Sequence, residues 1–204
     1  MLDLYKNKFK KIEVAVGRFF SLFPVSPNQY TLISLLFAFI ALYFLIRQNL
    51  ILVLVFFLMA GFLDFVDGAV ARYKNISTKI GAYLDTIVDR YVEGLLLLGM
   101  LFLPLPEILM PGYIWVFLIL FGAIITTYAK AAAKEKELVS QELKGGLLSR
   151  GERISLLLIA LILGIAEPSL TLMTSSLILI ALLANFTAIQ RIFSALRFNK
   201  SQFL

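Results

Sequence analysis

Residues 64–89 read DFVDGAVARYKNISTKIGAYLDTIVD and place four aspartates within two otherwise apolar segments. Asp64 and Asp67 are three residues apart, and Asp85 and Asp89 are four apart, so each pair shares one face of a helix. The short polar loop between the segments predicts two antiparallel helices, which bring both acidic faces to a similar depth. The stretch therefore predicts one layer of four carboxylates.

The sequence around this stretch predicts an all-α integral membrane protein. Hydrophobic residues make up 60% of the 204 residues, and charged residues only 16%. A helix needs roughly 20 apolar residues to cross a bilayer, and six segments approach or exceed this length. These predicted transmembrane helices are 31–46, 50–72, 79–102, 113–128, 154–165 and 171–192.

The N-terminal segment and the distribution of charge predict how the protein lies in the membrane. Residues 1–30 mix lysines with Leu4, Phe9 and Ile12, as an amphipathic interfacial helix would, and residues 31–204 form the six-helix domain. Five Lys and Arg residues precede Tyr30, and six lie within 130–153. The positive-inside rule therefore places both termini and the mouth of the acidic layer in the cytoplasm. The net charge of +6 is explained by topology and anionic lipid, so we expect no nucleic-acid partner.

The four aspartates predict a metal centre. A carboxylate inside a membrane span costs about 2.5–3.5 kcal/mol, so such residues are functional candidates. The chain contains no His and no Cys, which excludes imidazole or thiolate ligands and a Ser-His triad. Carboxylate oxygens suit Mg²⁺ or Mn²⁺, and four of them balance the charge of two such ions. Arg72, next to this layer, suits a pyrophosphate.

The spacing Asp-x₂-Asp-Gly-x₂-Ala-Arg-x₈-Gly-x₃-Asp-x₃-Asp, which begins at Asp64, resembles the signature of the CDP-alcohol phosphotransferase family. The resemblance implies transfer of a phosphate-linked group from a CDP-activated alcohol to a second alcohol, with release of CMP. It also implies that the four aspartates hold two metal ions and that Asp89 is the general base. It implies a homodimer and a CDP site formed by Asn28, Gly68, Ala71, Arg72 and Gly81. Asn28 as a helix cap is an equally good reading of that position.

Basic residues in the C-terminal half of the chain indicate which kind of acceptor the protein uses. A metal site inside the bilayer suits a CDP-linked lipid donor, either diacyl or ether-linked, and a soluble phosphorylated acceptor. Lys130, Arg150, Arg153 and Arg191 resemble the residues around the acceptor phosphate in the branch that uses inositol phosphate, the phosphatidylinositol-phosphate and archaetidylinositol-phosphate synthases. Ala132 stands where that branch commonly has a further arginine, so glycerol phosphate stays open as the acceptor.

Acids in spans also occur in cation transporters, which are the alternative class. A transporter needs polar residues along the whole pathway, yet 50–59 and 95–102 are almost wholly apolar. The basic residues have a simpler reading as cytosolic anchors of helix ends. The pattern favours an enzyme with a site in the cytosolic half of the membrane.

Overall fold

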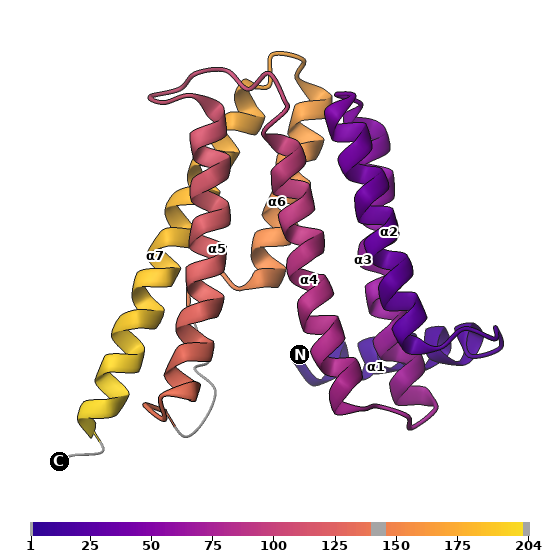
Figure 1. Cartoon of the computed structure of the whole chain (residues 1–204). Helices are drawn as coiled ribbons and strands as arrows, with labels where there is room; N and C mark the ends of the chain where they lie inside the picture. The colour runs from indigo at the N-terminus through magenta and orange to yellow at the C-terminus, as the bar shows by residue number, and fades with distance from the viewer. Residues whose placement is uncertain (1, 140–145, 202–204) are drawn as a thin grey trace. The chain divides into compact units, whose positions relative to one another are not determined.

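The structure is a computed structural model that describes residues 2–139 and 146–201, with side chains for 10–139 and 146–197. This part of the chain is all-helical apart from one isolated bridge between Ile108 and Met110. The helices are α1 (Leu2–Phe20), α2 (Pro27–Ile46), α3 (Leu50–Tyr73), α4 (Lys79–Met100), α5 (Gly112–Glu135), α6 (Arg150–Ala166) and α7 (Thr171–Ser201) (Figure 1). The predicted all-α class is confirmed.

The chain divides into two compact units, Met1–Leu96 and Leu97–Leu204, with the boundary inside α4. In the first unit, α2 and α3 form an antiparallel pair and α1 crosses α3 (Figure 1). A capping box between Ser26 and Gln29 starts α2 four residues before the predicted start at residue 31. The Asn49 side chain caps α3, which runs from residue 50 as the sequence predicts.

The second unit is built on α7, which packs against both α5 and α6. A Cβ atom added at Gly122 of α5 would lie 2.9 Å from the backbone carbon of Ala184 on α7, so glycine allows these two helices to approach closely. The α6 helix begins with a second capping box, formed by Ser149 and Glu152.

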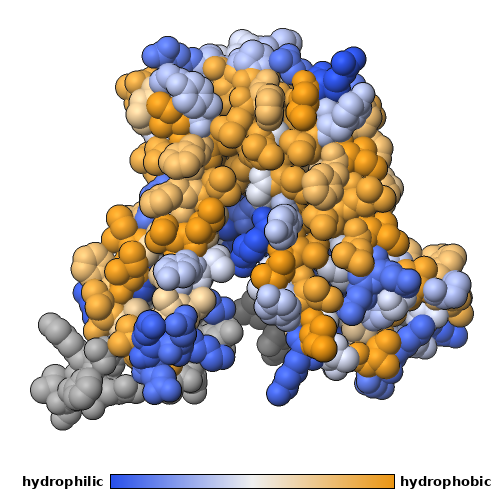
Figure 2. Space-filling model, viewed as in Figure 1, coloured by the Kyte–Doolittle hydropathy of each residue, from blue (hydrophilic) through white to orange (hydrophobic). Residues whose placement is uncertain are grey.

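Four helices in the described part of the chain are long and apolar enough to cross a membrane: Pro27–Ile46, Leu50–Tyr73, Gly112–Glu135 and Thr171–Arg197. Two of the six predicted spans fall short of this criterion. The α4 helix carries four charged residues between Asp85 and Glu93, and α6 has only 17 residues. Hydrophobic residues cover most of the visible helix surface, and hydrophilic residues gather toward the helix ends (Figure 2). Such exposed apolar helices are those of a membrane protein.

Candidate active site

Three aspartates of the first unit come together where α3 and α4 face each other. One carboxylate oxygen from each of Asp64, Asp67 and Asp85 lies within 4.8 Å of the other two. Asp67 is buried, with 6% of its surface exposed, and the other two are half-buried. Asp89 lies one helical turn further along α4, outside this three-residue group. The two acidic faces therefore converge, and three of the four predicted ligands form one cluster.

The cluster has the chemistry of a divalent-cation site. All its ligand atoms are carboxylate oxygens, which Mg²⁺ and Mn²⁺ prefer. Two oxygens that share one Mg²⁺ ion at about 2.1 Å lie up to about 4.2 Å apart. Small rotations of the aspartate side chains would therefore bring these oxygens, now within 4.8 Å of one another, to the distances of a bound ion. Three clustered carboxylates also repel one another unless a cation offsets their charge. The residues present therefore fit a metal ion.

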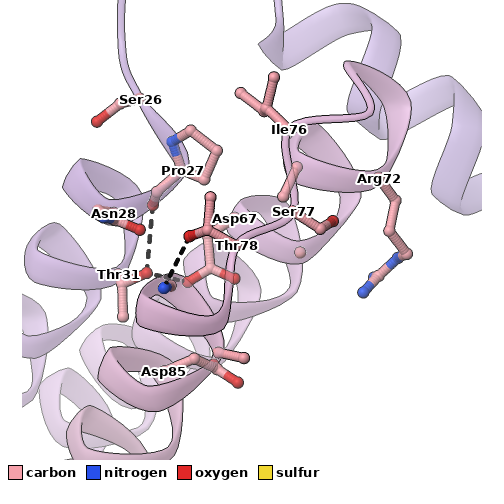
Figure 3. Close-up of a pocket in the computed structure, with 14 residues that line it drawn as sticks. Ser26, Pro27, Asn28, Thr31, Asp67, Arg72, Ile76, Ser77, Thr78 and Asp85 are labelled. Atoms are coloured by element: carbon pink, nitrogen blue, oxygen red, sulfur yellow. Dashed lines mark hydrogen bonds between the residues drawn. The ribbon is translucent and has the colours of Figure 1, made fainter.

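A pocket of about 260 Å³ opens beside these carboxylates. Its walls come from the start of α2, the last turns of α3, the loop to α4 and the first turns of α4. All five residues predicted for the CDP site line it: Asn28, Gly68, Ala71, Arg72 and Gly81. Asp67 and Asp85 line the same pocket (Figure 3). The predicted nucleotide residues and two of the predicted metal ligands thus share one cavity.

Small residues keep this pocket open. A Cβ atom at Gly81 would lie 3.2 Å from the Asn28 Oδ1 atom, and one at Gly68 would lie 2.9 Å from the Arg72 Nη2 atom. Ser26, rather than Asn28, caps α2, so the reading of Asn28 as a helix cap is wrong. The Asn28 side chain instead lies at the pocket wall, near Gly81 (Figure 3).

Several polar contacts near the site are not indicated by the sequence pattern. The Thr31 hydroxyl donates a hydrogen bond to the Asp67 carboxylate. The Arg72 Nε–H donates to the Glu13 carboxylate on α1. Glu93, only 2% exposed, lies 3.6 Å from Arg90 one turn earlier on α4. Glu93 is a carboxylate within an apolar segment, and the sequence alone could have indicated it as a candidate on that ground. The contacts Thr31–Asp67 and Arg72–Glu13 join different helices, so the sequence does not indicate them.

The four predicted acceptor residues all lie in the second unit, Lys130 on α5, Arg150 and Arg153 on α6 and Arg191 on α7. Arg153 is 2% exposed, and it lies close enough to Arg191 for the two charges to repel. A solvated anchor at a helix end would be exposed, so burial of Arg153 argues against that reading.

The start of α6 is docked on α7 by two hydrogen bonds. The Leu147 backbone N–H donates to the Gln190 side-chain oxygen at 3.1 Å, and the Leu148 N–H donates to the Thr187 hydroxyl at 3.0 Å. These bonds fix the first turn of α6 beside Arg191, one residue after Gln190. They hold the start of α6, which carries Arg150 and Arg153, against the part of α7 that carries Arg191.

The family model for CDP-alcohol phosphatidyltransferases matches residues 24–196 of this chain. The chain belongs to the CDP-alcohol phosphatidyltransferase family. It is therefore an enzyme of this class, and the transporter alternative loses its support. Seven of the eight signature residues line the pocket or form the carboxylate cluster, and the eighth, Asp89, lies one turn beyond Asp85 on α4.

Individual relatives are similar along nearly the whole chain. The archaetidylinositol phosphate synthase of Pyrococcus horikoshii is 31% identical over 198 residues, which cover 96% of each chain. The phosphatidylinositol phosphate synthase of Mycobacterium tuberculosis, solved with CDP-DAG bound, superposes with a TM-score of 0.78. That match is 22% identical and covers 91% of this chain and 94% of the other. A second structure of the same enzyme, with manganese and citrate, also has a TM-score of 0.78, at 22% identity over 90% of this chain and 88% of the other. These superpositions show that the chain shares the fold of that protein.

Proposed function

We propose that this enzyme transfers the phosphate-linked lipid group of a CDP-linked lipid to a hydroxyl of inositol phosphate and releases CMP. The observation that carries the proposal is that one pocket is lined by Asn28, Gly68 and Arg72 together with Asp67 and Asp85. A site with both phosphate-binding and metal-binding groups, set among membrane-crossing helices, suits a nucleotide headgroup attached to a lipid.

The donor assignment is supported by the chemistry of the pocket. Gly68 and Gly81 leave room for phosphate oxygens to approach the helix backbone. Arg72 offers a planar guanidinium that matches a phosphate with two hydrogen bonds. The donor's tails would stay in the bilayer, and either diacyl or ether-linked chains satisfy these contacts. The bound CDP-DAG in the mycobacterial enzyme is consistent with a donor of this kind.

The acceptor assignment depends on the basic group of the second unit. Lys130, Arg150, Arg153 and Arg191 would hold the phosphate of the acceptor, because several cations in a partly buried region bind a dianion strongly. The full-length similarity to an archaetidylinositol phosphate synthase supports inositol phosphate over glycerol phosphate.

The reaction forms one phosphorus–oxygen bond and breaks another. The acceptor hydroxyl attacks the lipid-bearing phosphorus, the bond to CMP breaks, and the hydroxyl proton passes to the Asp89 carboxylate. Asp64, Asp67, Asp85 and Asp89 would hold two divalent cations, Mg²⁺ or Mn²⁺, which offset the negative charge on the phosphates and the departing CMP. Asp89 would act mainly through its position, since an ordinary carboxylate is a weak base toward an alcohol.

The same proposal includes the arrangement in the membrane. We infer six spans, in which α4 and α6 join the four helices that are long and apolar enough alone. The charged residues of α4 would face the site and not lipid, and the 17 residues of α6 reach the short end of the length range for a span. Residues 1–30 would form the interfacial segment and 31–204 the catalytic domain, with both termini in the cytoplasm. The enzyme would be a homodimer.

The test is CMP release from CDP-diacylglycerol and its ether-linked analogue in detergent with Mg²⁺. Inositol phosphate, glycerol phosphate, inositol and serine are offered in turn, and Asp89→Asn serves as the blank. Release that requires inositol phosphate and is lost in the variant supports the proposal. Release with glycerol phosphate alone overturns the acceptor, and release without any acceptor indicates hydrolysis instead.

A further inference from the structure

We propose that Glu13 on α1 is a positioning residue for the CDP-linked donor, because it holds the Arg72 guanidinium in the orientation that receives the donor's phosphates. The proposal rests on the proposed function of the pocket. Glu13 lies before residue 24, where the family match begins, so nothing in the signature assigns it a role.

The α1 helix is fixed against α3 next to Arg72. A Cβ atom at Gly17 would lie 2.5 Å from the Ala69 carbonyl oxygen and 2.9 Å from the Tyr73 Cβ atom. The two backbones therefore meet where only glycine fits. Glu13 is one turn before Gly17 and shares its face, so this contact brings the Glu13 carboxylate to Arg72.

The end of α1 is also fixed. The Tyr30 hydroxyl on α2 donates to the Phe20 carbonyl oxygen at 3.1 Å. The Phe20 ring lies 5.9 Å from the Tyr30 ring and 5.7 Å from the Phe62 ring on α3, both edge-on. Because α1 is held at Gly17 and at Phe20, the position of Glu13 is fixed. Both members of the ion pair therefore lie on helices that are packed against each other.

The Arg72 guanidinium uses different nitrogen atoms toward Glu13 and toward the pocket. Glu13 accepts from Nε, while Nη1 and Nη2 lie over Gly68, 3.0 and 2.9 Å from where a Cβ atom would stand. Gly68 and Arg72 both line the pocket, and Arg72 is drawn at its edge (Figure 3). The carboxylate thus occupies the Nε donor and leaves the two terminal nitrogens on the pocket side, where a phosphate can accept from both.

An arginine side chain that is 58% exposed would otherwise sample many rotamers. Holding it in one orientation before the donor arrives lowers the ordering cost of binding. Glu13 therefore acts on donor affinity through Arg72. It does not contact the reacting atoms.

The test compares Glu13→Ala, Glu13→Gln and Glu13→Asp with the unmodified enzyme. We expect Glu13→Ala and Glu13→Gln to raise the KM for CDP-diacylglycerol and the Kd of its binding in detergent by roughly two- to fivefold, the range for an exposed ion pair. Glu13→Asp should recover part of this loss. The KM for inositol phosphate and the thermal unfolding midpoint should stay unchanged. Glu135→Gln is the control for lost charge, because Glu135 is exposed and forms an ion pair with its neighbour Lys136, far along the chain from Arg72.

A double-mutant cycle with Arg72→Ala separates positioning from a general effect. If Glu13 acts through Arg72, Glu13→Ala changes donor binding no further when Arg72→Ala is already present. Additive losses, unchanged donor binding, or tighter binding in Glu13→Ala would each overturn the proposal. If the unmodified enzyme itself binds no CDP-diacylglycerol, the proposed function fails, and this inference fails with it.

Discussion

Thr31 on α2 donates a hydrogen bond to Asp67 on α3, and both residues line the pocket. The Pro27 carbonyl oxygen lies 3.2 Å from the same hydroxyl oxygen, so the first turn of α2 surrounds this contact. Asp67 is the most buried member of the carboxylate cluster, and a buried carboxylate needs such partners. The bond therefore orients a proposed metal ligand from a neighbouring helix, as outer contacts of metal sites generally do.

Replacing Thr31 by valine keeps the side-chain shape and removes the donor. We expect Thr31→Val to raise the Mg²⁺ concentration for half-maximal CMP release by about tenfold, because a hydrogen bond to a charged group contributes roughly 1.5–3 kcal/mol. Thr31→Ser should retain most of the activity. Thr174→Val removes another buried hydroxyl, which lies on α7 and donates to the Leu170 carbonyl oxygen, and should leave the Mg²⁺ dependence unchanged. An unaltered Mg²⁺ titration in Thr31→Val would contradict the orienting role.

Removal of divalent cations should abolish CMP release, because the clustered carboxylates cannot offset the charge of a pyrophosphate without them. Activity should return when Mg²⁺ or Mn²⁺ replaces the chelator. Binding of Mn²⁺, followed by electron paramagnetic resonance, should weaken in Asp64→Asn, Asp67→Asn and Asp85→Asn. Persistent CMP release in excess chelator would rule out a metal-dependent reaction.

The glycine beside Arg72 provides a test of the donor site. In Gly68→Ala the added Cβ atom would lie 2.9–3.0 Å from the guanidinium nitrogens and displace them. We expect the KM for the CDP-linked lipid to rise roughly tenfold, since small displacements of binding groups are costly. Gly61→Ala lies on the same helix with nothing within 4 Å of its added Cβ atom, and it should behave like the unmodified enzyme. If the two variants have the same KM for the CDP-linked lipid, Arg72 does not take part in donor binding.

The helices around the motif follow closely from the sequence, because hydrophobic length and turn residues are local signals. The segment predicted at 50–72 is the helix Leu50–Tyr73, and that predicted at 79–102 is Lys79–Met100. The α2 helix begins earlier than the apolar run predicts, because the capping box at Ser26 precedes that run. Spacing within each helix likewise predicts that the aspartates face one another.

Contacts between helices are not local and could not be predicted. Glu13 and Arg72 are 59 residues apart, and their meeting depends on how closely α1 approaches α3 at Gly17. The bond from Thr31 to Asp67 depends in the same way on the packing of α2 against α3. Periodicity gives the face of each helix but neither its partner nor its register against that partner.

Arg191 provides the test of the acceptor site. It lies half-buried on α7, and its Nε atom is buried without a hydrogen-bond partner among the described residues. We expect Arg191→Gln to raise the KM for inositol phosphate by roughly 10- to 100-fold, the effect of losing a charged hydrogen bond to phosphate. The KM for CDP-diacylglycerol should change little.

Arg197→Gln is the matched control for Arg191→Gln, because it removes the same charge from the same helix at an exposed position. It should leave both KM values unchanged if the effect of Arg191 is a direct contact with the acceptor. Equal increases in the two variants would instead indicate that the positive charge attracts the acceptor from a distance. That effect would weaken with added salt, whereas a direct contact in a partly buried site would persist. Steady-state kinetics at two ionic strengths therefore distinguish a binding residue from a general electrostatic contribution.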